Sequence, residues 1–309
     1  MPPTRLPAAA RAVLAVLTTL ALGAGCAAAD GPGGADGSGG SGGSGDPRVR
    51  PPEAGAAFDY QIGGAYPPPP GVRVVSRDRA DRPAPGLYSV CYVNAFQAQP
   101  GELRWWRERH PALLLRGEDG RLVMDDAWDE ALLDTSTAGK RAALARIVGA
   151  WVDDCARRGF QAVEPDNLDS FERSGGLLTP ADNAAFARLL AARAHAAGLA
   201  IGQKNTAELL PRRAAVGFDF ALTEECGEYD ECGEYASAYD GRVLVVAYDE
   251  ADFAATCRRW GARIAVVLRD REVAPAGEPG HLSRTCRPAT TASPQARTRA
   301  PARAARLVR

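Results

Sequence analysis

The sequence contains very few histidines and lysines. Of its 309 residues only His110, His195 and His281 are histidines, and only Lys140 and Lys204 are lysines. The histidines are far apart and no cysteine or histidine spacing resembles a zinc site, so we expect neither a metal nor another cofactor. The net charge of −1 also lacks the basic excess that is typical of nucleic-acid binding, and we expect no nucleic-acid partner.

The N-terminal region has no apolar run long enough to span a membrane. Two arginines precede an apolar run over 12–25, which has the length of a signal-peptide core. The run ends in Gly23-Ala24-Gly25-Cys26, which resembles a bacterial lipoprotein cleavage site with its leucine displaced to Leu22. We therefore predict a signal peptide over 1–25 and an extracellular or cell-surface protein. Cys26 is the predicted lipid-anchored residue, with simple secretion as the alternative.

Two further segments cannot bury a core. Residues 26–52 are rich in glycine, serine, proline and aspartate, which predicts a flexible linker. Residues 287–309 repeat arginine, alanine, proline and threonine without apolar periodicity, which predicts a disordered basic tail. Binding of this tail to nucleic acid or cell wall is the alternative. We expect the remaining residues, 53–286, to form one folded domain that acts as a monomer.

Six cysteines follow Cys26, and export would place them in an oxidising compartment. An even number fits three disulfides, among 15 possible pairings. Cys226 and Cys232 enclose a short loop and are the first predicted pair. The other two pairs follow by elimination: Cys257 with Cys286, and Cys91 with Cys155. A nucleophilic thiol is the alternative, but no histidine is near any of them in sequence.

Short apolar runs rich in Val, Ile, Phe and Tyr recur along the domain and predict eight strands. The later ones alternate with helical patterns, among them 137–158 and 179–197. The second helix opens with Thr179-Pro180 and stops at Gly198. Weaker helical patterns cover 206–215, 229–239 and 250–260. The predicted strands are 58–62, 72–76, 87–94, 160–164, 199–203, 218–223, 243–248 and 263–268.

This alternation predicts an α/β fold with parallel strands, closed as a (β/α)8 TIM barrel. An open doubly wound sheet is the competitor, but Gly63-Gly64 does not match its glycine-rich fingerprint. The barrel should be irregular around strands two and three, because the short link with Pro83 and Pro85 leaves no room for a helix. We interpret 96–136, which contains three tryptophans, as an inserted loop region over one mouth.

Function in such a barrel collects at the carboxyl ends of the strands, where two acidic clusters stand out. Strand four ends in Glu164 and Asp166, which share the inward parity suggested by the small Ala162. Strand six ends in Glu224 and Glu225. These strands are not adjacent, so the two clusters should face one another across the mouth. Opposed carboxylates are what glycosidic cleavage requires, whereas the alternative is capping and salt bridging.

Other polar residues at strand ends are candidates for holding a sugar. Lys204 is also a candidate Schiff-base nucleophile, but acidic neighbours would keep it charged, which favours an orienting or charge-balancing role. Trp105, Trp106 and Trp128 are candidates for stacking on sugar rings. The acidic stretch 224–234 would attract a cationic polymer if it is not simply a solvated face. The predicted sugar-binding residues are Tyr60, Gln61, Glu164, Asn167, Lys204, Asn205, Glu225 and Tyr248.

Several motifs together resemble glycoside hydrolase family 114, the endo-α-1,4-polygalactosaminidases and their relatives. The resemblance covers about 58–249. It implies a secreted or surface-bound (β/α)8 barrel that cleaves partly deacetylated galactosamine polymers without a metal, with Asp166 and Glu224 as the acid pair. The motifs are Tyr60-Gln61-Ile62-Gly63-Gly64, Cys91-Tyr92-Val93, Gly159-Phe160, Glu164-Pro165-Asp166-Asn167-Leu168-Asp169, Lys204-Asn205, Phe218-Asp219-Phe220, Glu224-Glu225-Cys226 and Glu231-Cys232.

Some details leave alternatives open. The small residues Ala221 and Thr223 suggest that Glu225, rather than Glu224, continues the inward face of strand six. Ala247 stands where relatives often carry glutamate, Gln161 stands where aspartate is common, and the region between strands two and three is short. The sequence therefore predicts an exported or lipid-anchored hydrolase of an amino-sugar polysaccharide, with an inactive glycan-binding barrel lipoprotein as the alternative.

Overall fold

The computed structural model describes residues 49–286. The predicted signal peptide over 1–25, the anchor residue Cys26, most of the predicted linker and the tail 287–309 lie outside the described residues. The predicted domain 53–286 falls entirely within them.

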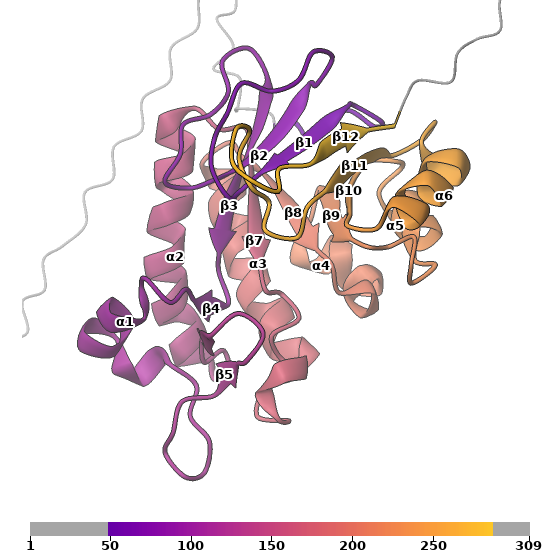
Figure 1. Cartoon of the computed structure of the whole chain (residues 1–309). Helices are drawn as coiled ribbons and strands as arrows, with labels where there is room; N and C mark the ends of the chain where they lie inside the picture. The colour runs from indigo at the N-terminus through magenta and orange to yellow at the C-terminus, as the bar shows by residue number, and fades with distance from the viewer. Residues whose placement is uncertain (1–48, 287–309) are drawn as a thin grey trace, which may run out of the picture. The chain divides into compact units, whose positions relative to one another are not determined.

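Eight parallel strands form a nearly closed barrel, as predicted (Figure 1). A ninth strand, β12 (Ser283–Thr285), pairs antiparallel with β11, and β1 packs against both at the seam. Every predicted strand is present, with bounds that shift by at most two residues. The barrel strands are β1 (Phe58–Gln61), β2 (Val74–Asp78), β3 (Tyr88–Asn94), β7 (Ala162–Asp166), β8 (Ala200–Lys204), β9 (Phe220–Glu224), β10 (Val243–Ala247) and β11 (Ala265–Arg269).

Two long helices pack side by side on the outside of the barrel (Figure 1). Thr137 caps the N-terminus of helix α2 (Ala138–Arg158), where its hydroxyl accepts a hydrogen bond from the backbone N–H of Lys140. Helix α3 (Pro180–Ala196) begins with a capping box between Thr179 and Asp182, which confirms the start predicted from Thr-Pro. Both caps satisfy backbone N–H groups that the first helical turn leaves without partners.

The remaining helices are shorter. Helix α6 (Glu250–Trp260) matches its prediction, and Asp249 caps its first turn. The pattern at 206–215 is divided into the 3-10 helix η3 (Ala207–Arg212) and the short α4 (Arg213–Val216), because Pro211 lies inside it. The pattern at 229–239 shortens to α5 (Cys232–Ala238). As predicted, no helix separates β2 from β3, and none separates β1 from β2 either.

The segment between β3 and α2 is more ordered than the predicted loop. It forms a three-stranded sheet in the order β4 (Gln97–Ala98), β6 (Glu130–Leu132), β5 (Met124–Asp125). Two short helices, α1 (Leu103–Arg109) and η1 (Pro111–Leu113), lie within it. Figure 1 shows β4 and β5 beyond the carboxyl end of β3, so this inserted sheet stands next to the barrel mouth.

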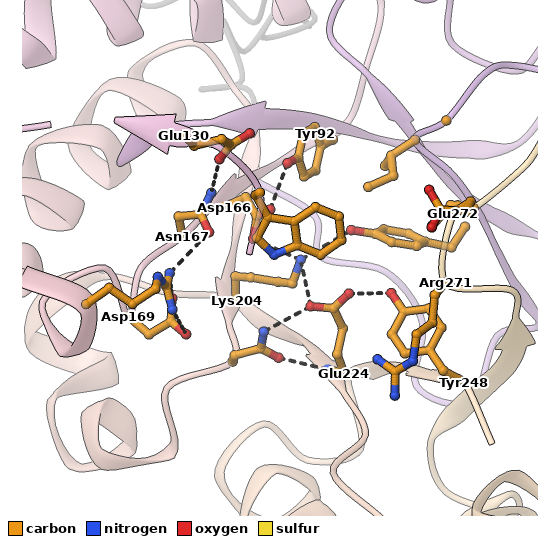
Figure 2. A pocket seen from close by; sticks show the side chains of 17 residues that line it. Tyr92, Glu130, Asp166, Asn167, Asp169, Lys204, Glu224, Tyr248, Arg271 and Glu272 are labelled. Carbon is orange, nitrogen blue, oxygen red and sulfur yellow. Dashed lines mark hydrogen bonds and ion pairs between the residues drawn. The ribbon is translucent and has the colours of Figure 1, made fainter. Parts of the chain in front are cut away.

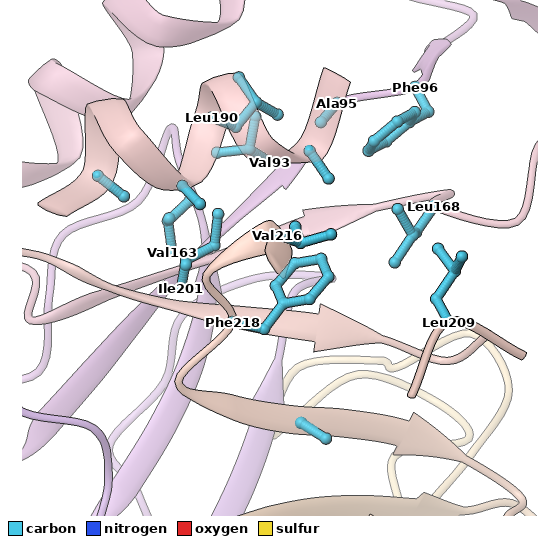
Figure 3. Packing of buried hydrophobic residues seen from close by; sticks show 14 of the residues in the cluster. Val93, Ala95, Phe96, Val163, Leu168, Leu190, Ile201, Leu209, Val216 and Phe218 are labelled. Carbon is cyan, nitrogen blue, oxygen red and sulfur yellow. The ribbon is translucent and has the colours of Figure 1, made fainter. Parts of the chain in front are cut away.

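The barrel has an inner and an outer apolar layer. Figure 3 shows part of the outer one, where Val163 and Ile201 of neighbouring strands pack with Leu190 of α3. The inner layer includes Phe220 and Leu222 of β9, whereas Ala221 belongs to the outer layer. Large side chains fit inside because β8 carries Gly202 opposite Phe220, where an added Cβ would lie 2.9 Å from the ring.

The parity expected for strand six from small residues was therefore wrong. Phe220 and Leu222 point inward, so the next residue of that parity is Glu224. Glu225 takes a left-handed backbone conformation with φ 55°, just after the strand ends. The size of a side chain did not indicate its direction here, because glycine on the neighbouring strand makes room for a phenyl ring inside.

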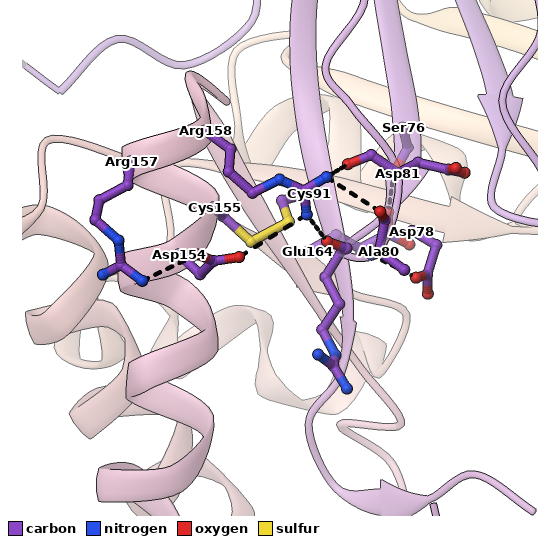
Figure 4. The surroundings of a disulfide bond; sticks show 11 residues. Ser76, Asp78, Ala80, Asp81, Cys91, Asp154, Cys155, Arg157, Arg158 and Glu164 are labelled. Atoms are coloured by element: carbon purple, nitrogen blue, oxygen red, sulfur yellow. Dashed lines mark hydrogen bonds and ion pairs between the residues drawn. A yellow bond between two sulfur atoms is a disulfide. The ribbon is translucent and has the colours of Figure 1, made fainter. Parts of the chain in front are cut away.

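Three disulfides join the same pairs as expected. Cys91–Cys155 links β3 to α2, and both residues are buried (Figure 4). Arg158, at the end of α2, donates hydrogen bonds to backbone carbonyls of the loop after β2, including that of Ala80 at 3.1 Å. These contacts hold the helix end against the part of the barrel that has no helices of its own.

Candidate active site

A cavity of about 290 Å³ opens at the carboxyl ends of the barrel strands. Its walls come from the ends of β1, β3, β7, β8 and β9, from the loops after β10 and β11, and from the inserted sheet. Figure 2 shows that the labelled polar side chains converge on one space. This is the place where a barrel of this type assembles a reactive site.

Lys204 lies at the centre of the site, and its side chain is only 2% exposed. Its Nζ lies 2.9 Å from Oδ1 of Asp166, 3.2 Å from Oε1 of Glu164 and 3.4 Å from Oε2 of Glu224. Burial alone would lower the pKa of Lys204, but the three carboxylates outweigh burial and raise that pKa well above its ordinary value. Lys204 is therefore a fixed positive charge, which makes it a poor Schiff-base nucleophile.

Asp166 is held in its ionised form. Burial would raise its pKa, but the Lys204 ammonium and a hydrogen bond from Tyr92 hold the pKa below its ordinary value. The Tyr92 hydroxyl donates to Oδ2 of Asp166 at 2.7 Å. Burial and the nearby Asp166 charge raise the pKa of Tyr92 itself, so this phenol stays a donor.

Glu224 approaches the same cation from the end of β9, which lies on the other side of β8 from the strand that carries Asp166. Asn205 donates to its Oε2 at 3.1 Å, and the Tyr248 hydroxyl donates to its Oε1. The backbone N–H of Glu224 in turn donates to the Asn205 side chain at 2.8 Å. Its side chain is 28% exposed, against 17% for Asp166, so Glu224 is the more open to the cavity and to water.

The shared ammonium limits the separation of the two carboxylates. Oδ1 of Asp166 and Oε2 of Glu224 lie 2.9 Å and 3.4 Å from Nζ of Lys204, so these two oxygens are at most 6.3 Å apart. The lysine separates like charges that would otherwise raise each other's pKa values. The cavity thus holds two carboxylates in different surroundings at a short distance.

Five of the other residues predicted to hold a sugar also line this cavity, whereas three predicted residues do not. Glu164 lies behind Lys204 and is fully buried, where it accepts hydrogen bonds from Tyr60 at 2.9 Å and Ser76 at 2.6 Å. Burial raises the pKa of Glu164 to about 7. The five that line the cavity are Tyr60, Asn167, Lys204, Asn205 and Tyr248.

Gln61 and Glu225 are the other two that lie outside the cavity. Gln61 is buried in a polar cluster, where it donates to Asp59 at 2.8 Å and accepts from Arg77 at 2.9 Å. The Glu225 carboxylate pairs with Arg271 at 2.7 Å. Of the two acidic residues that end strand six, Glu224 is therefore the one inside the cavity.

Some cavity residues were missing from the sequence-based set. Arg271 and Glu272 follow β11, and applying the strand-end rule to that last strand would have found them. Tyr92 lies within a motif that had been noted, but it was not assigned a role. Glu130 comes from the inserted sheet, for which no strand-end rule exists.

The three tryptophans of the inserted segment lie in different places, and one of them is at the cavity. Trp128 lines the cavity and is 62% exposed. Trp106 is fully buried against Trp151, and Trp105 lies at a separate surface hollow with Arg79. Only Trp128 is placed to stack on a sugar ring in this cavity.

A second cavity of about 380 Å³ adjoins the first and shares Asp169, Asn205 and Glu224 with it. It includes part of the acidic stretch 224–234. Burial and neighbouring acidic groups raise the pKa values of Glu172 and Glu231 in its wall. Carboxylates gathered in this way attract positively charged ligands.

Within residues 49–286 the structure contains neither a metal-binding cluster nor a membrane-spanning helix. No group of three or more histidine, cysteine, aspartate or glutamate side chains in this part of the chain is arranged to hold a metal ion. Nor does any helix in the same region combine the length and the apolar character needed to cross a bilayer.

Comparison with known proteins identifies the family. Ega3 of Aspergillus fumigatus, solved in complex with galactosamine, matches with TM-score 0.62 and 21% identity over 77% of this chain and 98% of its own. The glycoside hydrolase domain of PelA from Pseudomonas aeruginosa matches with TM-score 0.49 and 15% identity, over 72% and 96%. No functionally curated protein matches in sequence. A family model matches residues 43–291, and the chain thus belongs to glycoside-hydrolase family GH114.

Proposed function

We propose that the protein is an exported, endo-acting hydrolase of a galactosamine-containing polysaccharide, with Asp166 as nucleophile and Glu224 as general acid and base. The observation that carries this proposal is the approach of both carboxylates to Lys204 within one cavity, from the two strands that flank β8. Glycosidic cleavage needs one carboxyl group that stays ionised and another that can give and take a proton.

The surroundings of each carboxylate support this division of roles. Asp166 has a lowered pKa and is held by Lys204 and Tyr92, so it keeps the charge that attack on the anomeric carbon requires. Glu224 is the more exposed and is positioned by Asn205 and Tyr248. In the first step Asp166 bonds to the anomeric carbon while Glu224 protonates the departing oxygen. In the second step Glu224 takes a proton from water, which then displaces Asp166.

The short distance between the carboxylates supports retention of anomeric configuration. Retaining enzymes hold the pair about 5–5.5 Å apart and inverting enzymes about 6.5–9.5 Å apart. The Asp166 and Glu224 oxygens nearest Lys204 are at most 6.3 Å apart, which favours the closer, retaining arrangement. Proton NMR of the first products should therefore show the α-anomer before mutarotation.

Three observations support an amino-sugar polymer as the substrate. The solved structure of Ega3 contains galactosamine, a cation at neutral pH. The adjoining cavity has an acidic wall that would favour a cationic chain. The main cavity is itself crowded with carboxylates around a single lysine. Electrostatic attraction of a polycation should make cleavage weaken with rising salt concentration.

We further propose that the protein works outside the cell. The signal-peptide pattern over 1–25 and the three disulfides fit an exported protein. In this proposal Cys26 carries a lipid anchor, 26–52 is a flexible tether and 53–286 is the catalytic domain. The basic segment 287–309 is then a solvated tail, and the protein acts as a monomer.

The rival function is glycan binding without cleavage on the same barrel. The sequence departures that suggested it do not alter the cavity. Gln161 accepts from the backbone of Ser89 at 2.7 Å at the start of β7, and Ala247 is not part of the cavity wall. The key side chains for cleavage are present, which favours the hydrolase.

Turnover by the purified full-length chain tests the proposal. Partly deacetylated α-1,4-galactosaminan should yield new reducing ends, whereas Asp166→Asn and Glu224→Gln should each lower the rate at least about 1,000-fold. Glu225→Gln should have a far smaller effect, because its side chain lines only the adjoining cavity and is paired with Arg271. Saturable binding of the polymer without new reducing ends would establish the rival function. Full activity of Glu224→Gln with loss in Glu225→Gln would reverse the assignment.

A further inference from the structure

The inserted sheet brings a third carboxylate, Glu130, to the wall of the cavity. Glu130 is the first residue of β6 and is only 9% exposed. Its Oε2 accepts hydrogen bonds from the side-chain amides of Asn94 at 2.8 Å and Asn167 at 3.3 Å. Within residues 49–286, its Oε1 accepts no hydrogen bond and no lysine or arginine forms an ion pair with it.

The charges around Glu130 leave its own charge uncompensated. Asp166 and Asp125 are close enough to disfavour its ionised form. Arg173, a nearby cation, is held by Asp125 at 2.7 Å and by Asp169 at 2.8 Å. Burial, with those two aspartates, raises the pKa of Glu130 to about 7. A carboxylate in this position would gain a partner from a cationic ligand.

Glu130 lines the same cavity as Asp166, which attacks the anomeric carbon in the proposed mechanism. Asn167 directly follows Asp166 and donates to Glu130 (Figure 2) and also to Asn94. Its left-handed backbone, with φ 63°, turns the chain at this point. A sugar whose anomeric carbon meets Asp166 carries its C2 substituent on the adjacent carbon. In galactosamine that substituent is an amine.

We propose that Glu130 binds the C2 ammonium of the sugar unit that Asp166 attacks, and thereby selects a free amine over an N-acetyl group. This inference rests on the proposed function. Glu130 would then determine which sugar is accepted at the position where the linkage is cleaved.

Two physical effects support this role. The transition state develops positive charge at the anomeric carbon, and an ammonium on the neighbouring carbon opposes that charge. A carboxylate against the ammonium offsets the repulsion, because electrostatic interactions are strong in a partly dehydrated cavity. An N-acetyl group carries no charge, and its carbonyl oxygen would be repelled by the free oxygen of Glu130. The selection therefore acts on both binding and rate.

Binding of monosaccharides to the full-length chain tests the inference without turnover. The wild-type protein should bind galactosamine at least about tenfold more tightly than galactose or N-acetylgalactosamine, as measured by calorimetry or NMR titration. Glu130→Gln should lose this preference and retain its affinity for galactose, because glutamine keeps the shape and an acceptor for Asn94. Glu118→Gln, at an exposed site of the same inserted segment, should bind all three sugars as wild type does.

Product analysis on a partly N-acetylated polymer provides the second measurement. The sugar attacked by Asp166 becomes the new reducing end, which mass spectrometry can identify. Wild type should yield reducing ends with a free amine, whereas Glu130→Gln should yield mixed ends and cleave the deacetylated polymer at least about tenfold more slowly. Glu130→Asp keeps the charge and should retain the preference in weakened form. If Glu130→Gln fails to fold, the Glu130→Asp variant tests the inference in its place.

The outcomes distinguish this inference from the proposed function. Glu130→Gln with an unchanged galactosamine preference and unchanged reducing ends would overturn the role of Glu130 while cleavage stands. Absence of any preference in the wild-type protein would overturn it as well. Loss of the galactosamine preference in Glu130→Gln, in a wild-type protein that releases no reducing ends, would support amine recognition and refute the hydrolase.

Discussion

Asp166 and Glu224 are bound to one and the same cation, with Nζ of Lys204 lying 2.9 Å from the first carboxylate and 3.4 Å from the second. Two acidic groups at this separation would normally compete for a proton. The lysine removes that competition, because it supplies a positive charge that the surrounding carboxylates, Glu164 among them, maintain against the effect of burial. In the proposed mechanism this arrangement keeps Asp166 ionised as the nucleophile, while Glu224 serves as general acid and base.

Replacing Lys204 with methionine should affect both stability and rate. Buried carboxylates would lose their counter-charge, which is expected to cost about 3–5 kcal/mol of the free energy of unfolding. Asp166 would also become harder to ionise, so kcat should fall at neutral pH. Urea unfolding and turnover of the polymer measure the two effects.

The other lysine provides a matched control. Lys140 is 36% exposed, pairs with the buried Asp134 and lines no described cavity, so Lys140→Met should cost clearly less stability than Lys204→Met. Equal stability of the two variants would contradict the charge-balancing role of Lys204. Borohydride trapping of substrate on Lys204 would instead establish Schiff-base chemistry.

Azide rescue should assign the two carboxylates separately. In Asp166→Ala, azide would take the place of the nucleophile and attack an aryl α-galactosaminide oligomer from the opposite face, giving the β-azide. In Glu224→Ala, azide would attack the covalent intermediate and give the α-azide. NMR of the products distinguishes the anomers. Reversed products would exchange the two roles, and rescue of neither variant would argue against a covalent intermediate.

The barrel and half of its site could be predicted from local patterns alone. Short apolar runs alternate with helical periodicity, and the capping signal at Thr179 marks the start of α3. The rule that function gathers at strand ends then identified Asp166, Lys204 and Glu224. The strand and helix predictions succeed because they depend on residues that are close in sequence.

The remaining site residues depend on contacts between distant segments. Glu130 reaches the cavity only because its strand pairs with β4 and β5, and Asn94 then holds its side chain. The inward direction of Glu224 was ambiguous from sequence, because Gly202 on the neighbouring strand decides how large an inner residue β9 can carry. Gln61 looked accessible at a strand end but is buried with Arg77.

Replacing Trp128 with alanine should weaken substrate binding and leave stability unchanged. The indole is 62% exposed at the cavity wall, so its removal should change the free energy of unfolding by about 0.5 kcal/mol or less. Lost stacking on a sugar ring is expected to cost about 0.5–1.5 kcal/mol, or roughly a two- to tenfold rise in KM. Trp105→Ala, at the separate surface hollow, is the control and should keep the wild-type KM.

The disulfides should separate stability from activity. Cys91–Cys155 encloses a span of 64 residues and Cys226–Cys232 a span of 6. Loop-closure entropy then predicts losses of about 4 and about 2 kcal/mol for the respective double alanine variants. For kcat/KM we expect the opposite order, with the larger loss in the Cys226→Ala/Cys232→Ala variant. Cys226 lies two residues after Glu224, and its disulfide holds the loop that follows Glu224. A larger loss of activity in Cys91→Ala/Cys155→Ala would contradict this view.

Glu130 should make the folded protein less stable as pH rises. Burial raises its pKa from 4.5 to about 7 in the folded state, so the unfolded chain releases this proton first. Between those values the free energy of unfolding falls with pH, by up to about 3 kcal/mol from this group alone. Glu130→Gln removes the titration, and the variant should therefore gain stability relative to wild type between pH 4.5 and 7.5.

Urea unfolding of both proteins at several pH values measures that difference, and titration of all other groups largely cancels in it. Glu118→Gln should show no such gain, because its exposed carboxyl group is not buried on folding. A stability difference that stays constant with pH, or that falls as pH rises, would mean that ionisation of Glu130 does not destabilise the folded protein. A gain at high pH combined with loss of amine selection would mean that this side chain sacrifices stability for recognition, as functional residues commonly do.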